Sequence, residues 1–337
     1  MTGDLVNSDK ASIAQFVVSI SLILLIFILL NTAQARVGKN ECPENRYLLP
    51  NLQDYDHLKY APAERERLYN GGTFISSVDS IDDDNGDGKE EYLVQPNWVA
   101  YHLKSFNSNR GSNYAPSYRR PKNWYRLKLF NEEREHYKTN QNVGNSYLGM
   151  GHVWNRGHLS QRADSNRITP EFGCNTHVFS NAVPQSPKFN RGIWQGMENY
   201  VSSLSNERGE LWVVTGPVYE KEKIIQFIGE REKKEIPVAV PDKLFKVIFM
   251  ESERGVEVIS LIYPNKFDKL PTYYKEGNCQ QDKKYDHTPY IVSLKDVEDA
   301  TGLTFFSGFE MDLSEFKKIK ATILPTVGDE YRVGYCL

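Results

Sequence analysis

Several patterns that define other protein classes are missing from this 337-residue chain. It has no heptad run and no repeat of roughly 20–50 residues, which excludes a coiled coil and a solenoid. It has no long polar tract, and its 25% of charged residues is ordinary for a globular protein. It contains no Cys-x-x-Cys pair for zinc or redox chemistry and no Asn-x-Ser/Thr site for N-glycosylation. What remains is a globular chain, long enough for a sizeable packed core.

The first 35 residues have the composition of a targeting segment. Phe16 to Leu30 is an uncharged, almost wholly apolar run, and Ala33-Gln34-Ala35 after it is the small-residue pattern at which signal peptidase cuts. A run of about 15 residues is shorter than the roughly 20 that a membrane-spanning helix needs. We therefore expect residues 1–35 to be a cleaved signal peptide and the protein to be secreted. Counting the run from Ile13 leaves open an uncleaved signal anchor, which would hold the protein on a membrane, facing a lumen or the exterior.

The cysteines are compatible with an oxidising compartment. They are Cys42, Cys174, Cys279 and Cys336. Because their number is even, we expect two disulfides, in one of three connectivities. Cys42 and Cys336 lie near the two ends of the mature chain, so each is expected to fasten a terminal segment to the folded body.

The mature chain divides into a short extension and one larger domain. Residues 36–94 are loop-rich, and residues 95–337 contain no clear linker, which favours a single domain. Apolar runs predict strands at residues 97–103, 211–216, 244–250 and 256–263, and apolar positions at helical spacing between 193 and 204 predict a helix. The irregular alternation of strands and helices indicates an α+β fold.

An acidic run at residues 82–88 ends the extension and resembles half of a calcium-binding loop. Asp83, Asn85, Asp87 and Gly88 have the spacing of an EF-hand. The twelfth position, however, is Val94 where a bidentate Glu is required, which excludes an EF-hand. A partial Ca²⁺ site and a hydrated acidic turn both stay open.

Positive charge is concentrated in one part of a chain whose net charge is −3. Residues 101–195 carry 14 Lys and Arg against five acidic residues, a local excess of +9 with Tyr and Trp interleaved. Binding to a nucleic-acid backbone requires such a composition. On charge alone, a solvated cationic face without a partner is an equal alternative.

The residues that carry chemistry lie between Trp154 and Tyr200. They are Asn155-Arg156-Gly157-His158, Asn181-Ala182-Val183-Pro184-Gln185, Asn190, Trp194 and Glu198. This combination resembles the DNA/RNA non-specific endonucleases, the ββα-metal nucleases that include mitochondrial endonuclease G. The first group is similar to the family's catalytic R-G-H, and the others to its N-x-x-P-Q…N…W…E pattern. The resemblance covers roughly residues 95–265 and implies a ββα-metal fold, with a central antiparallel sheet flanked by helices.

The resemblance implies a role for each matched residue. His158 is the general base that takes a proton from the attacking water. Asn190 is the direct metal ligand, because its amide oxygen suits Mg²⁺; Mn²⁺ and Ca²⁺ are alternatives. Glu198 holds metal-bound water and so orients the ion without ligating it. Asn190 and Glu198 are eight residues apart on the predicted helix. Their side chains would project about 80° apart around the helix axis, so both can border one site.

Three further residues are implied to handle the phosphate or the geometry of the site. Asn181 positions the site or the phosphate, and Arg156 presents a guanidinium fork that matches phosphate oxygens. The family also places an upstream arginine on the scissile phosphate. Arg119 and Arg120 are both candidates, and we take Arg120.

The implied function is a secreted, Mg²⁺-dependent endonuclease of DNA and RNA with little base specificity, since phosphate contacts carry no sequence information. Asn155 departs from the family, whose motif is commonly D-R-G-H. Asn keeps the carbonyl but loses the charge, so a catalytically silent nucleic-acid-binding homologue is the alternative. A zinc site of His152, His158 and His177 is disfavoured by their spacing. The preference between DNA and RNA and the oligomeric state do not follow from the sequence.

Overall fold

The computed structural model describes much of the chain from Cys42 onward. The described residues are 42, 56–78, 95–105, 118–121, 124, 146–147, 153–220, 225–229, 235, 237–266, 273–274 and 284–328. The targeting segment, the acidic run, Cys279 and Cys336 lie outside them, so the structural predictions made for those residues stay untested by the structure. The chain divides into two units at Cys42, and the fold below is that of the second unit, Cys42–Leu337. None of the helices in the described ranges is long and apolar enough to cross a membrane.

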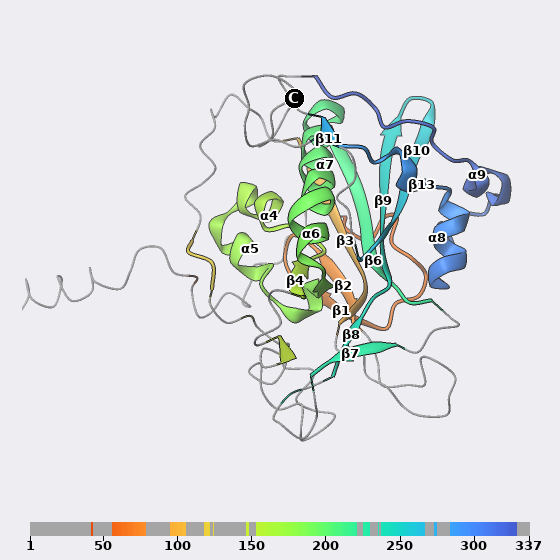
Figure 1. Cartoon of the computed structure of the whole chain (residues 1–337). Helices are drawn as coiled ribbons and strands as arrows, with labels where there is room; N and C mark the ends of the chain where they lie inside the picture. Colours follow the sequence, from red (N-terminus) through yellow and green to blue (C-terminus); the bar gives the residue numbers. More distant parts are fainter. Residues whose placement is uncertain are drawn as a thin grey trace, which may run out of the picture. The chain divides into compact units, whose positions relative to one another are not determined.

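A seven-stranded antiparallel sheet forms the centre of this unit (Figure 1), in the order β1-β2-β3-β6-β9-β10-β13. The strands are β1 (Arg67–Asn70), β2 (Ile75–Val78), β3 (Pro96–Lys104), β6 (Glu210–Val218), β9 (Lys243–Ser252), β10 (Gly255–Pro264) and β13 (Ile291–Val292). The four predicted strands are β3, β6, β9 and β10, and the arrangement confirms the predicted α+β class. β1 and β2 come from the segment taken as the extension, yet β2 pairs with β3 and β1 pairs with β2, so both are part of the central sheet. The boundaries of the domain stay a prediction.

Helices and short ribbons complete the unit. Its helical elements are α4 (Arg162–Ile168), α5 (Pro170–Asn175), the 3₁₀ turn η2 (Phe179–Asn181), α6 (Pro187–Phe189), the π-helical turn η3 (Asn190–Trp194), α7 (Gln195–Arg208), the 3₁₀ turn η5 (Thr288–Tyr290), α8 (Leu294–Thr301) and α9 (Ser314–Lys318). The ribbons pair β4 (Asn155–His158) with β5 (Ala182–Gln185), β7 (Gln226–Ile228) with β8 (Val238–Val240), and β11 (Tyr273–Tyr274) with β12 (Lys284–Tyr285).

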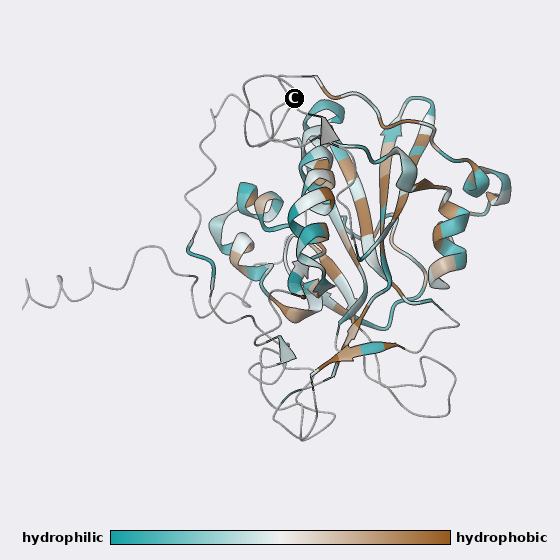
Figure 2. Cartoon of the chain, in the orientation of Figure 1, coloured by the Kyte–Doolittle hydropathy of each residue, from teal (hydrophilic) through white to brown (hydrophobic). Residues whose placement is uncertain are grey.

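Both faces of the sheet are buried, each under its own helix. On one face, Tyr101 of β3 and Ile248 of β9 belong to the core under α7; on the other, Trp98 and Phe249 belong to the core under α8. Successive residues of a strand point to opposite faces, so a sheet covered on both sides needs continuous apolar runs such as residues 211–214. In Figure 2 the ribbons of the central strands are brown alternating with pale, and the ribbons of α4 and α7 are largely teal and pale.

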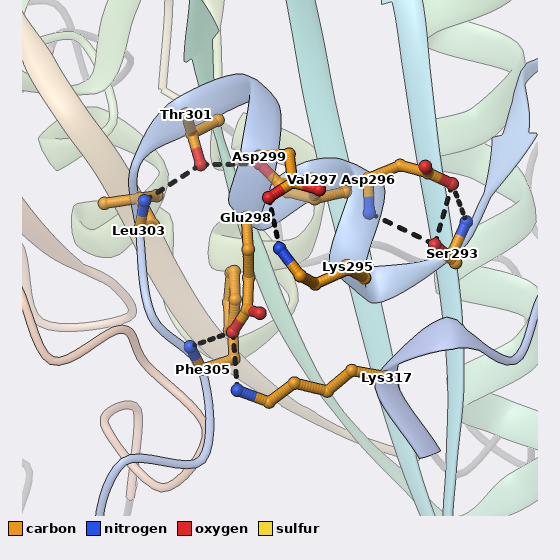
Figure 3. A network of polar contacts seen from close by, with 10 residues as sticks. All are labelled: Ser293, Lys295, Asp296, Val297, Glu298, Asp299, Thr301, Leu303, Phe305 and Lys317. Atoms are coloured by element: carbon orange, nitrogen blue, oxygen red, sulfur yellow. Dashed lines mark hydrogen bonds and ion pairs between the residues drawn. The ribbon is translucent and has the colours of Figure 1, made fainter. Parts of the chain in front are cut away.

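Side-chain hydrogen bonds define the start of α8 and hold α9 to it (Figure 3). Ser293 and Asp296 form a capping box, in which the Ser293 Oγ accepts from the Asp296 amide at 3.1 Å and the Asp296 Oδ2 accepts from the Ser293 amide at 2.8 Å. The Glu298 carboxylate accepts from the Phe305 amide at 2.8 Å and from the Lys317 Nζ at 2.7 Å. The last two contacts fasten the segment after α8, and α9 itself, to α8.

One disulfide lies within the described residues. It joins Cys42 to Cys174 of α5, so Cys42 fastens a segment near its end of the chain, as expected. Only one of the three possible connectivities contains the Cys42–Cys174 pair. The second disulfide of that connectivity would join Cys279 to Cys336, which lie outside the described ranges.

Candidate active site

The R-G-H motif lies on the ribbon formed by β4 and β5. His158 stands opposite Ala182, and Asn155 stands opposite Gln185. Gly157 is required by this pairing, because a Cβ at its position would lie 2.0 Å from the Gln185 Cδ. After β5 the chain passes through α6 and η3 into α7. The order of two strands followed by a helix is the ββα arrangement that the resemblance implies.

Contacts from three sides hold His158. Its carbonyl oxygen accepts hydrogen bonds from the Trp194 indole Nε1 at 3.2 Å and from the Gln185 amide nitrogen Nε2 at 3.4 Å. Its ring lies 4.5 Å from the ring of Trp124 and meets the ring of His177 edge-on at 5.0 Å, both between centroids. The imidazole orientation is therefore determined by packing and by the link to the start of α7.

The surroundings of His158 favour the neutral imidazole. Burial lowers the pKa of His158 well below 6.5. Electrostatic repulsion from its neighbours lowers this pKa further; they are His177, Arg120, Arg162 and Arg156. The pKa of His177 is likewise lowered, to about 3, chiefly by burial and then by Arg162 and Arg120. A neutral imidazole can accept a proton, so His158 is in the form that a general base needs.

Asn181 is completely buried, and its side chain is used by the backbone. Its Oδ1 accepts from the Ser160 amide at 2.8 Å, and its Nδ2 donates to the carbonyls of Ser160 and Thr176 at 2.9 and 3.0 Å. Of the two roles expected, these bonds fit positioning of the loop that follows His158 and leave no polar atom for a phosphate.

Three arginines lie near His158, and none of them pairs with a carboxylate of the part of the chain that the structure describes. The Arg156 Cζ lies 5.3 Å from the centroid of the Trp124 ring, and Arg162 donates to the Tyr118 carbonyl. Arg120 is exposed. Within the described ranges none of the three forms an ion pair, so their charges are available to an anion. Of the two upstream candidates, Arg120 contributes to the lowered pKa of His158, and Arg119 does not.

Asn190 and Glu198 are not on one continuous helix. The backbone departs from helical geometry at Gly192, where φ is −115° and ψ is −112°, so the 80° estimated for an unbroken helix does not describe their relation. Both are partly exposed. Trp194 lies between them in the chain and bonds to His158, which brings this turn to the ribbon.

The donors present fit a cation that keeps most of its own waters. The described part of the chain has no group of three or more His, Cys, Asp or Glu side chains that could hold a metal. An amide oxygen from Asn190, with Glu198 accepting hydrogen bonds from metal-bound water, would be a donor set suited to Mg²⁺, which dehydrates reluctantly and needs few protein ligands.

Sequence reasoning missed three members of the site. His177 was considered only for zinc, and Trp124, which packs against both histidines, was passed over. Lys246 is fully buried, with its Nζ 4.4 Å from the centroid of the Trp194 ring. The strand pattern contained a signal for Lys246. It lies two residues from Leu244 and two from Ile248 on β9, so its side chain faces the same core as theirs.

Comparison with known proteins decides the family. The profile of the DNA/RNA non-specific endonucleases matches residues 89–312, more than half of the chain. The chain belongs to this family. The expected resemblance and the ββα-metal fold are thereby confirmed, and the family is one of metal-dependent nucleases.

Individual members of the endonuclease family match over part of the chain. The mitochondrial nuclease EXOG of Xenopus laevis is 32% identical over 49% of this chain and 44% of its own length. Mitochondrial endonuclease G of Bos taurus is 26% identical over 57% of this chain and 60% of its own. The match thus spans less than two thirds of these relatives. The structure of the EndoG/EndoGI complex has a TM-score of 0.51 at 21% identity, covering 73% of this chain and 88% of that chain, which shows a shared fold.

The prediction of a secreted protein is wrong. Relatives from Xenopus laevis, mouse, human and cattle are named as mitochondrial nucleases, and the signal peptide expected at residues 1–35 loses its support with them. The physical reason is that targeting segments are recognised by receptors, so an apolar run with small residues after it does not by itself specify the compartment.

Proposed function

We propose that this chain is a metal-dependent endonuclease that hydrolyses phosphodiester bonds of DNA and RNA with little base specificity. The observation that carries the proposal is a histidine, His158, that is held by Trp194 and Trp124 near three arginines with no carboxylate partner in the described ranges. A base and a concentration of positive charge at one place are what attack of water on a phosphodiester requires.

Each residue has a chemical task in this proposal. The His158 imidazole takes a proton from the attacking water. Arg156 and Arg120 bind the non-bridging phosphate oxygens, whose negative charge grows in the transition state. Asn190 holds the divalent cation and Glu198 accepts hydrogen bonds from its waters. The cation, when bound, supplies charge stabilisation at the phosphate and at the leaving oxygen.

A catalytically silent nucleic-acid-binding protein is the second candidate, and Asn155 is the observation that favours it. The Asn155 Oδ1 accepts a hydrogen bond from Arg191 at 3.0 Å, so the side chain still makes an orienting contact without the charge of an aspartate. If only orientation matters at this position, the chain is an active enzyme.

Digestion of plasmid DNA and of total RNA tests the two candidates. We expect degradation of both substrates with Mg²⁺, none with EDTA, and a loss of about 100-fold or more in the His158→Ala variant. Arg208→Ala, at the exposed end of α7, is the matched control and should retain full activity. Retention of DNA without cleavage under any divalent ion would favour the silent binder, and Asn155→Asp would then be the variant in which to look for restored activity.

The names of the relatives bear on location. We propose the mitochondrion, in a compartment oxidising enough to keep the Cys42–Cys174 disulfide. Fractionation of cells that express the full chain checks this, and recovery in the culture medium alone would contradict it.

A further inference from the structure

His177 is a second buried histidine beside the predicted base. It lies between α5 and η2, is almost completely buried, and its backbone amide donates to the Cys174 carbonyl at 3.1 Å. Its ring meets the ring of His158 at an interplanar angle of 90°, with 5.0 Å between the two centroids. A side chain that only filled this space could be an apolar ring, because a buried imidazole also needs hydrogen-bond partners. What its two nitrogens bind therefore decides its role.

The hydrogen-bond partners of His177 assign its ring proton to Nδ1. Nδ1 lies 3.5 Å from the Thr176 hydroxyl oxygen, whose own proton is donated to the Gly173 carbonyl at 2.8 Å. That hydroxyl can therefore only accept from the ring. Burial and two arginines lower the pKa of His177, and hydrogen bonds to the backbone of Cys174 and Gly173 oppose this, as carbonyls that accept from the ring do. A neutral imidazole carries one proton, so the Nε2 of His177 is left as an acceptor.

Two ring nitrogens at this contact are buried without a hydrogen-bond partner in the part of the chain that the structure describes. They are the Nε2 of His158 and the Nε2 of His177. A buried donor or acceptor without a partner costs about 1–3 kcal/mol. The two nitrogens avoid this cost if they satisfy each other. Because the Nε2 of His177 is an acceptor, the Nε2 of His158 must then carry the proton.

The spacing of the two rings suits such a bond. A hydrogen bond of about 2.9 Å between facing nitrogens places two imidazole centroids about 5 Å apart, and the observed distance is 5.0 Å. The two nitrogens are not aligned for this bond in the structure. A turn of either ring about its Cβ–Cγ bond redirects a nitrogen at little cost, because that torsion is broad. Hydrogen bonds of catalytic groups are often poorly aligned without substrate and tighten when it binds.

We propose that His177 is a positioning residue for the base: its Nε2 accepts the Nε2 proton of His158 and so leaves the lone pair of His158 on Nδ1, the atom that takes the proton from water. The inference rests on the proposed function and deepens it, since it assigns the base a partner, a tautomer and a reacting atom. His158 is partly exposed although its Nε2 is buried, so the atoms that face solvent lie elsewhere on the residue. His177 touches neither the water nor the phosphate and acts through His158.

Nitrogen-15 NMR of the histidine rings tests the inference in the full chain without nucleic acid. Chemical shifts and long-range couplings distinguish a protonated from an unprotonated ring nitrogen. The two rings are assigned by the signals that disappear in His158→Gln and in His177→Phe. Near neutral pH we expect the proton of His158 on Nε2 and that of His177 on Nδ1. The opposite tautomer in either ring would overturn the inference.

Two substitutions separate hydrogen bonding from packing. His177→Phe keeps an aromatic ring against Trp124 and His158 and removes the acceptor. His158 should then divide between its two tautomers, and kcat should fall by roughly 10- to 100-fold because the base is no longer held in its productive form. His177→Gln brings an amide oxygen close to the place of Nε2 and should recover most of the activity. Wild-type kcat in His177→Phe, or no recovery in His177→Gln, would overturn the inference.

His102→Phe is the matched control. His102 is also a buried histidine against a tryptophan, with its ring 4.3 Å from that of Trp212, which belongs to the core on the other face of the sheet. This variant should lose comparable stability in denaturant unfolding and keep its kcat. An equal fall of kcat in His102→Phe and His177→Phe would show that His177 contributes only to the fold.

A double variant and the wild-type spectrum complete the test. His158→Ala with His177→Phe should be no slower than His158→Ala alone, because His177 has nothing left to position; a further loss of kcat would overturn the inference. If His177→Phe does not fold, the tautomers of the wild-type protein decide. Failure of the wild-type protein to cleave DNA or RNA with any divalent ion would contradict the proposed function, whereas the tautomers are measured without cleavage.

Discussion

The indole nitrogen of Trp194 donates a hydrogen bond to the carbonyl oxygen of His158 across 3.2 Å. This single bond joins the strand that carries the predicted base to the turn that carries the predicted metal ligand. Replacing Trp194 by Phe keeps an aromatic ring but removes the donor and the volume of the second indole ring, which leaves a cavity at this buried position. We expect a stability loss of about 1 kcal/mol from the hydrogen bond, with a further loss from the cavity. Because His158 loses its anchor, we also expect a fall in kcat of roughly 10- to 100-fold.

Trp98→Phe is the matched control for that variant. Trp98 is equally buried and donates to the Glu64 carbonyl at 2.7 Å, but it belongs to the core on the other face of the sheet. It should lose similar stability in denaturant unfolding while kcat stays unchanged. Equal losses of kcat in both variants would show that Trp194 acts through general stability only.

Gly157 leaves no room for a side chain on the ribbon. A Cβ there would lie 2.0 Å from the Gln185 side chain, so Gly157→Ala should cost about 1–3 kcal/mol of unfolding free energy. Gly308→Ala is the control, since a Cβ at that position meets nothing within 4 Å. Adding Gln185→Ala to Gly157→Ala should recover part of the stability; no recovery would argue that the backbone and not Gln185 is the obstacle.

The pH dependence of cleavage should report the arginines around His158. Positive neighbours disfavour the protonated imidazole, so they hold the pKa of His158 down. Arg162→Gln removes one of them and should raise that pKa. The acid limb of the pH profile of kcat/KM should then move to higher pH, while Arg208→Gln leaves it in place. A shift to lower pH, or none, would contradict the proposed electrostatics.

Salt dependence can decide between the two upstream arginines. A side chain that neutralises one phosphate contributes about 0.9 to the slope of log K against log salt concentration on duplex DNA. With EDTA present to prevent cleavage, Arg120→Gln should lower the slope by about this amount, and with Mg²⁺ it should also lower kcat. Arg119→Gln is the adjacent exposed control and should leave kcat unchanged; the reverse result would transfer the role to Arg119.

The disulfide holds the segment that carries these arginines. The Cys42 Sγ lies 3.6 Å from the Arg119 carbonyl oxygen, and Tyr118 donates to Glu171 of α5 at 2.8 Å. Replacing Cys42 and Cys174 together by Ala should cost about 2–4 kcal/mol and raise KM, because Arg120 is then less well placed. An unchanged KM despite the lost stability would show that the disulfide stabilises the fold without positioning Arg120.

Much of the fold could be predicted because its signals are local. Apolar runs such as residues 244–250 identify strands, and this signal does not depend on where the strand lies in the fold. The break at Gly192 could not be predicted in this way, since a glycine inside a helical pattern is compatible with either a continuous or a broken helix. The compartment was misassigned for a different reason: composition does not identify the receptor that reads a targeting segment.

The family, the α+β class and the residue types of the site follow from the amino-acid sequence, because R-G-H and the later Asn, Trp and Glu positions lie within one short stretch. Which charges act on these residues follows from the folded arrangement of the chain. Arg120 and Arg162 approach His158 from separate segments, and Lys246 comes from a strand more than 40 residues beyond Glu198. Electrostatic effects depend on distance in space, and a linear pattern of residues contains no measure of that distance.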